Sequence, residues 1–153
     1  MIKKIFIASD HAGFELKQKF LKDNPQLPWV DLGPGDASSV DYPDYAKKLC
    51  EKMIEKIASH PATEEALQSG VCGVLICGSG QGMAIRANKF PQIRAALCWN
   101  EEVARLSRQH NNANVLCLGS RMMSHEQAQK ILETFLESKF EGGRHSQRVA
   151  KLC

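Results

Sequence analysis

The sequence has no long hydrophobic run, because none of its apolar stretches approaches the roughly 18 residues that a membrane-spanning helix requires. Its N-terminus also lacks the apolar core of a signal peptide, so we expect a cytoplasmic protein with no membrane contact. Basic runs interleaved with aromatic residues are missing as well, and the formal net charge is only +3. We therefore expect no nucleic-acid partner.

Cysteine pairs at the spacings of redox or zinc motifs are also missing, although the chain has six cysteines. Cys77, Cys98 and Cys117 each lie in or at the end of a short apolar run, as free buried thiols do. These settings indicate reduced thiols rather than a disulfide framework. We expect no metal site.

Short apolar runs alternate with helical patterns along the whole chain. The alternation predicts a five-stranded parallel sheet with right-handed helical crossovers, an α/β fold in one domain that spans residues 1–153. The expected strands cover residues 4–9, 29–32, 71–77, 94–98 and 114–118. The expected helices cover residues 13–22, 43–59, 80–89, 101–110 and 124–140, with a last helix after the glycine pair at 142–143. We expect the polar segment 59–69 to be a surface insertion.

The end of the third expected strand is the most informative part of the chain. The apolar run 71–76 ends at Cys77, and Gly78, Gly80 and Gly82 follow with one residue between each pair. Such a loop exposes backbone amides at the start of a helix, where an anion can bind. The positive electrostatic potential of these amides also favours the thiolate form of a nearby cysteine. The pattern favours a chemical role for Cys77 over that of a small buried hydrophobic residue.

Other polar residues follow the first and fifth expected strands, namely Asp10, His11, Ser120 and Arg121. Because ligands bind beyond the carboxyl ends of parallel strands, we expect these side chains to gather near Cys77. Asp10 either caps the next helix or orients an imidazole toward a substrate oxygen, and spacing alone leaves both interpretations open.

A second group of charged residues lies later in the chain. His110 ends an expected helix, where it either complements the helix dipole or serves in acid–base chemistry. Arg144 and Arg148 are four residues apart, so they share one face of the last helix and can bind a phosphate, although a solvated basic face has the same pattern. Arg121 is a third candidate cation. Together these residues suggest an enzyme that acts on a small phosphorylated molecule.

Seven ordered blocks extend over nearly the whole chain. They are Ser-Asp-His-Ala-Gly-Phe at 9–14, Asp-Tyr-Pro-Asp-Tyr-Ala at 41–46, Ile-Cys-Gly-Ser-Gly-Gln-Gly at 76–82, Ala-Asn-Lys-Phe at 87–90, Ser-Arg-Gln-His-Asn at 107–111, Leu-Gly-Ser-Arg at 118–121 and Glu-Gly-Gly-Arg-His-Ser-Gln-Arg at 141–148. In this order they resemble the ribose-5-phosphate isomerase type B family, which also contains galactose-6-phosphate isomerase subunits.

The resemblance implies a Rossmann-like fold with three α/β/α layers and an aldose–ketose isomerisation through an enediol, without a metal or cofactor. It implies that Cys77 is the base that moves a proton between C2 and C1 and that Ser79 helps to relay the proton between O1 and O2. It also implies that His110 donates a proton when the sugar ring opens. The substrate contacts it implies are Asp10, His11, Gly78, Ser79, Gly80, Gln81, Gly82, Asn111, Arg121, Arg144 and Arg148. Members of the family form dimers, so it also implies a homodimer, or a tetramer, whose active sites combine residues of two subunits.

Three functions remain open from the sequence. The leading one is the interconversion of ribose 5-phosphate and ribulose 5-phosphate in the pentose phosphate pathway. An isomerase of a six-carbon sugar 6-phosphate, such as allose or galactose 6-phosphate, differs from it by one carbon. A non-catalytic sugar-phosphate binding module on the same fold is the third.

Overall fold

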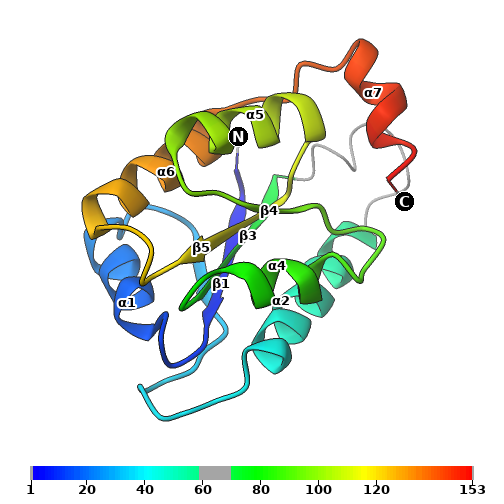
Figure 1. Ribbon diagram of the computed structural model, residues 1–153. Helices are drawn as coiled ribbons and strands as arrows, with labels where there is room; N and C mark the ends of the chain where they lie inside the picture. Colours follow the sequence, from blue (N-terminus) through cyan, green and yellow to red (C-terminus); the bar gives the residue numbers. More distant parts are fainter. Residues whose placement is uncertain (1, 59–69, 153) are drawn as a thin grey trace.

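The computed structural model describes residues 2–58 and 70–152, and its centre is a parallel sheet in the order β2-β1-β3-β5-β4. The strands are β1 (Lys4–Ser9), β2 (Trp29–Asp31), β3 (Val71–Cys77), β4 (Ala95–Leu97) and β5 (Val115–Gly119) (Figure 1). The helices are α1 (Phe14–Asp23), α2 (Tyr42–Ala58), α4 (Gln81–Ala87), α5 (Glu101–Asn111), α6 (His125–Glu137) and α7 (Arg144–Val149). The predicted five-stranded parallel sheet is confirmed.

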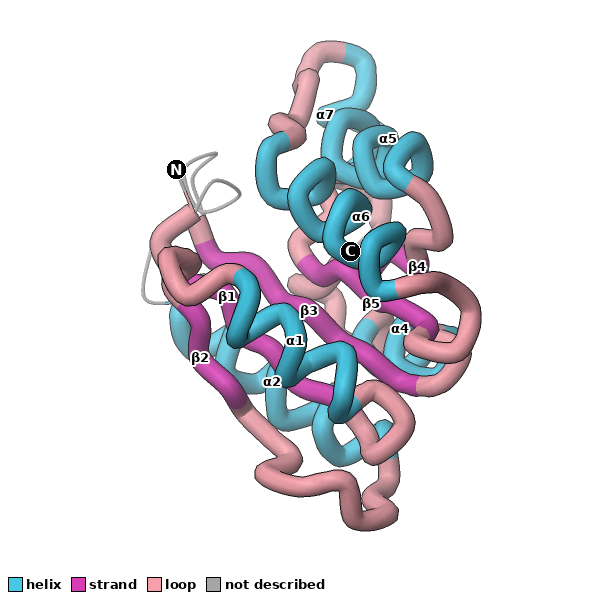
Figure 2. Tube along the Cα trace, turned by 90° about the vertical axis from the view of Figure 1, so that its left-hand side faces the viewer, coloured by secondary structure: helices cyan, strands magenta, loops and turns pink. Residues whose placement is uncertain are grey.

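Two apolar clusters cover the two faces of the sheet, because successive strand residues point to opposite sides. Ile5, Val74 and Leu116 face one way and pack with residues of α1, α5 and α6. Phe6 and Leu75 face the other way and pack with residues of α2 and α4. The result is three layers, α/β/α, and Figure 2 shows α1 and α6 in front of the sheet with α2 behind it. Within the described residues, no helix has the length and apolar character needed to cross a bilayer.

Element boundaries differ from the expectation mainly where side chains from elsewhere intervene. Strand β3 has the expected bounds, but α4 ends at Ala87 instead of residue 89. There the Asn88 side chain exchanges two hydrogen bonds with the backbone of Ala95, of 2.9 and 2.8 Å. Helix α6 stops at Glu137 instead of residue 140, and the carbonyl of the extended Ser138 accepts a hydrogen bond from Arg108 Nε at 3.4 Å. The expected insertion at 59–69 lies outside the described residues.

One lysine is completely buried beside the first strand connection. Lys17, on α1, has 0% of its side chain exposed, and its ammonium nitrogen lies 2.7 Å from both carboxylate oxygens of Asp31. A third hydrogen bond of 2.8 Å goes to the carbonyl of Pro34. The three N–H donors of the ammonium are therefore satisfied, and they tie α1 to the end of β2 and to the loop that follows it.

Candidate active site

Cys77 is the last residue of β3 and is 4% exposed. Its Sγ accepts a hydrogen bond of 3.1 Å from the amide of Gly80, so the glycine loop folds back over the sulfur. Gly80 has φ 77°, and a Cβ added to it would lie 2.9 Å from the carbonyl carbon of Leu118. Glycine is therefore required there both by the backbone conformation and by the close approach of β5. The hydrogen bond fixes the sulfur beside the backbone of the glycine loop.

The loop after β5 is fastened to the loop after β3. The Ser120 hydroxyl shares its proton between the carbonyls of Ala12 and Cys77, at 2.8 and 3.2 Å, so it joins the ends of β3 and β5 to the turn after β1. The amide of Arg121 donates to the carbonyl of Gly78 at 3.0 Å. A Cβ on Gly78 would lie 3.4 Å from Arg121 Nη1, which places the guanidinium against the glycine loop. The predicted gathering at the carboxyl edge of the sheet is thus observed for Ser120 and Arg121.

Asp10 is buried at the same edge, after β1. Its carboxylate accepts a hydrogen bond of 2.9 Å from the amide of Gly13, the residue before α1, so it closes the turn between β1 and α1 and caps none of the amides within the helix. The His11 ring instead turns toward the loop before α2, where its Nδ1 lies 3.5 Å from the amide nitrogen of Val40. In the glycine loop, Ser79 Oγ lies 3.4 Å from the amide nitrogen of Gln81.

We expect Gly13→Ala to lower the free energy of unfolding by about 1–3 kcal/mol in urea titrations, as overpacked sites do. A Cβ on Gly13 would lie 2.4 Å from the carbonyl oxygen of Ile76, at the end of β3, so α1 or β3 would have to move. Gly35→Ala is the matched control, since nothing lies within 4 Å of its added Cβ. Equal stability of the two variants would contradict the close packing of Gly13 on the strand.

Tyr42 contacts the glycine loop at Gly82, and the sequence alone did not predict this contact. A Cβ on Gly82 would lie 2.4 Å from the Tyr42 ring, so the first residue of α2 occupies the space beside the start of α4. Tyr42 is 40% exposed, which leaves part of this ring open to solvent at the same edge. Tyr42 belongs to the Asp-Tyr-Pro-Asp-Tyr-Ala block, which marks the segment as a shared feature of the family but does not indicate where the ring points.

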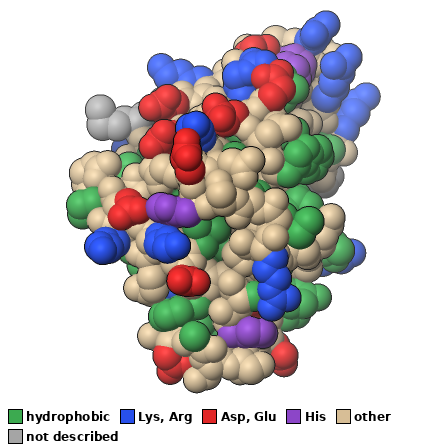
Figure 3. All heavy atoms as spheres, turned by 60° about the vertical axis from the view of Figure 1, so that its left-hand side comes forward, with side chains coloured by type: hydrophobic (Ala, Val, Ile, Leu, Met, Phe, Trp, Pro, Cys, Tyr) green, Lys and Arg blue, Asp and Glu red, His purple; other side chains and the backbone are tan. Residues whose placement is uncertain are grey.

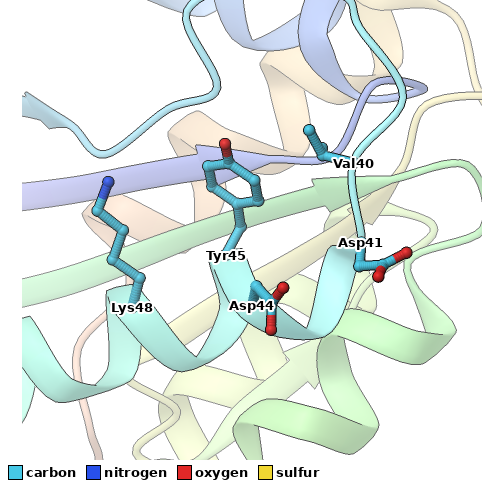
Figure 4. A pocket seen from close by; sticks show the side chains of 5 residues that line it. All are labelled: Val40, Asp41, Asp44, Tyr45 and Lys48. Carbon is cyan, nitrogen blue, oxygen red and sulfur yellow. The ribbon is translucent and has the colours of Figure 1, made fainter.

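An open hollow of about 370 Å³ lies on the first turns of α2 and the preceding loop (Figure 4). Its lining residues are Val40, Asp41, Asp44, Tyr45 and Lys48. Lys48 is engaged there, because its Nζ donates to the carbonyl of Leu32 at 2.7 Å. Two carboxylates against one engaged lysine make this hollow unsuitable for a phosphate.

Four other predicted site residues lie at the opposite edge of the sheet. Helix α5 runs back across the sheet, so His110 and Asn111 come just before the start of β5, whereas Cys77 pairs with its end. Strand β5 has five residues, and at ~3.3 Å per residue it separates the two edges by roughly 15 Å. Arg144 and Arg148 are exposed on α7, which packs against α5. Within one chain, the structure therefore does not bring these four residues to Cys77.

Figure 1 places α7 at the top of the molecule, and basic side chains gather at this end in Figure 3. His145, in the first turn of α7, is 7% exposed and stacks on His110, with ring centroids 4.3 Å apart and planes 6° apart. Burial lowers the pKa of His145, and the nearby His110 and Arg144 lower it further. The sequence analysis assigned no role to His145.

The protein-family model described as Ribose/Galactose Isomerase matches residues 5–152 of this chain. The chain belongs to this family. Relatives include the probable ribose-5-phosphate isomerase B of Mycoplasma pneumoniae, 45% identical over 97% of this chain and 91% of the relative. The ribose-5-phosphate isomerase B of Escherichia coli is 41% identical over 97% of this chain and 93% of the relative.

Solved structures of family members have the same fold. A ribose 5-phosphate isomerase from Thermotoga maritima superposes with a TM-score of 0.85, at 45% identity over 97% of this chain and 96% of that one. Ribose-5-phosphate isomerase B from Mycoplasma genitalium, with bound ribulose 5-phosphate, has a TM-score of 0.84 at 41% identity. That match covers 97% of this chain and 93% of the other.

Proposed function

We propose that the protein interconverts ribose 5-phosphate and ribulose 5-phosphate, a step of the pentose phosphate pathway. The observation that carries the proposal is the Sγ of Cys77, which lies at the carboxyl end of β3 and accepts a hydrogen bond from Gly80 inside the glycine loop. A cysteine held beside the amides of the glycine loop combines a base with a site for the negative charge that the base creates. Relatives named ribose-5-phosphate isomerase B support the choice of sugar.

In the proposed reaction, Cys77 removes a proton from C2 of the open-chain sugar and returns it to C1, while a proton moves from O2 to O1 with the help of the Ser79 hydroxyl. The electron pair left behind forms an enediolate, whose oxygens lie against the glycine loop. The backbone amides of Gly78, Gly80, Gln81 and Gly82 would stabilise this charge, together with the hydroxyl of Ser79. Asp10 and His11 would contact the sugar, and Arg121, beside Gly78, would bind a substrate oxygen.

The remaining residues of the proposed site would come from a second copy of the chain. His110, Asn111, Arg144 and Arg148 lie at the other edge of the same subunit, about the length of β5 away from Cys77. A homodimer that places this edge of one subunit against the carboxyl edge of its partner completes two equivalent sites. There His110 would donate a proton as the sugar ring opens, while Arg144 and Arg148 bind the phosphate.

We also propose a cytoplasmic location. Five cysteines, at positions 50, 72, 77, 98 and 117, are free thiols, as expected of a reducing compartment.

The test is turnover by protein that has been treated with EDTA. We expect rapid formation of ribulose 5-phosphate from ribose 5-phosphate, and slower conversion of allose 6-phosphate measured in parallel. Faster conversion of allose 6-phosphate would identify the six-carbon sugar, and not ribose 5-phosphate, as the substrate. If the intact protein converted neither sugar but still bound ribose 5-phosphate, the isomerase assignment would be wrong and a binding role would replace it.

A further inference from the structure

The contact between α5 and α7 brings three potential metal ligands together. His110 Nε2 and His145 Nε2 each lie 3.8 Å from the same carboxylate oxygen of Glu141, Oε2. One ligand atom of each residue lies within 4.8 Å of the other two. Two imidazoles and one carboxylate therefore converge on a small volume.

The backbone holds this cluster in place. The amide of Glu141 donates to the carbonyl of Gln109 at 3.0 Å, so the segment before α7 is fastened to the last turn of α5. Gly142 and Gly143 then turn the chain with φ 65° and 55°, and the turn brings His145 over the ring of His110. The side chain of His145 is 8% exposed, whereas those of His110 and Glu141 are 37% and 50% exposed, so a cation can enter from solvent.

The chemistry of these ligands fits a borderline divalent transition metal. Zinc binds imidazole nitrogen and carboxylate oxygen at about 2.0–2.2 Å in a tetrahedral arrangement, which sets its ligand atoms ~3.3–3.5 Å apart. The observed separations are 3.8 Å from each imidazole to Glu141 and up to 4.8 Å across the cluster, so the ligand atoms must close by about 0.3–1.5 Å. The stacked imidazole planes are nearly parallel, so the His110 ring must also turn before both rings can direct a nitrogen at the same ion. The half-exposed carboxylate can supply this movement, together with a rotation of the His110 ring. A neutral imidazole is the form that binds metal.

We propose that His110, His145 and Glu141 form an inhibitory binding site for Zn²⁺, in which the ion occupies the imidazole that would otherwise donate a proton to the sugar. The binding part stands on the cluster alone, and the inhibitory part rests on the proposed function of His110. Arg144 and Arg148 are close enough to lower the pKa of His145, so they also oppose a cation, and the neutral ligands must supply the affinity. The cluster does not include Cys77 or the glycine loop, so it is compatible with a reaction that needs no metal.

Binding is tested by competition of Zn²⁺ with a chromogenic chelator, using the full chain in a Cys153→Ser background that removes the terminal thiol. We expect Glu141→Gln and His145→Gln to weaken Zn²⁺ binding at least about ten-fold. Glu141→Gln changes a half-exposed side chain, so it keeps the test valid if the buried His145→Gln fails to fold. His125→Gln is the matched control, because His125 also lies within 4 Å of a carboxylate, that of Asp23, but is outside this cluster. Equal affinity of all these proteins for Zn²⁺ would overturn the site.

Inhibition is measured as the ratio of turnover with Zn²⁺ to turnover without it, so each variant is its own reference. We expect Zn²⁺ to slow the parent protein and to slow Glu141→Gln only at a concentration at least about ten-fold higher. Tight binding with the expected variant pattern but unchanged turnover would overturn the inhibitory role while leaving the coordination in place. A parent protein with no turnover in the absence of Zn²⁺ would instead contradict the proposed function, and the chelator competition would still decide whether the metal site exists.

Discussion

Replacing Cys77 by alanine should lower kcat for ribose 5-phosphate by at least about 10²–10⁴-fold, the contribution typical of a general base. The variant removes the sulfur that accepts a hydrogen bond from the Gly80 amide. It thereby removes the only group that we propose for abstracting the C2 proton. Binding of the sugar phosphate should persist, because the arginines and the loop amides remain. Steady-state kinetics and calorimetric titration with ribose 5-phosphate measure the two effects separately.

Cys72→Ala is the matched control for this prediction. Cys72 belongs to the same strand and is equally buried, and burial raises the pKa of its thiol, so it is not suited to act as a base at neutral pH. We expect this variant to turn over ribose 5-phosphate at nearly the parent rate. A Cys77→Ala protein that retained most of its kcat would assign the proton transfer to another group.

Replacing His110 by glutamine should also remove most of the turnover of ribose 5-phosphate, and mixing this variant with Cys77→Ala should restore part of it. The two residues lie at opposite edges of one chain, so a dimer made of one subunit of each variant contains one intact site and one doubly defective site. Random exchange of subunits should return about a quarter of the parent activity, since half of the dimers are hybrids with one working site of two. Activity is followed after the two proteins have been mixed and incubated.

Cys77→Ala mixed with Arg121→Gln is the control for the mixing experiment. Arg121 lies against Gly78, at the same edge as Cys77, so both sites of the hybrid carry one defect and no activity should return. Native mass spectrometry verifies that hybrids form in both mixtures. Hybrids of the first pair that show no more activity than those of the control pair would place His110 in the same site as the Cys77 of its own chain.

The buried centre of the fold could be read from the sequence, whereas its margins could not. Strand β3 has the expected bounds because an apolar run bordered by glycines is typical of a strand covered on both faces. Strand β4, expected over 94–98, is only Ala95–Leu97 because it lies at the edge of the sheet and pairs with β5 alone. The early end of α6 coincides with a contact between Ser138 and Arg108, which no local pattern contains.

The candidate site was also predictable only in part. Cys77 ends a strand, and Asp10 and Arg121 each follow one, so the topology of a parallel sheet is enough to bring them to one edge. The stacking of His110 on His145 depends instead on how α7 packs against α5, so spacing along the chain gives no indication of it.

The burial of Lys17 has a practical consequence for following the molecule in mixtures. An acylating reagent modifies an amine only when it can reach it, and the amine of Lys17 is enclosed by Asp31 and Pro34, with 0% of the side chain accessible. Acetylation of this lysine, read by peptide mass spectrometry against the surface lysine at position 52, therefore counts the molecules in which α1 has detached from the sheet. Acetylation of Lys17 thus measures opening of the native chain in a crude extract, without an engineered probe.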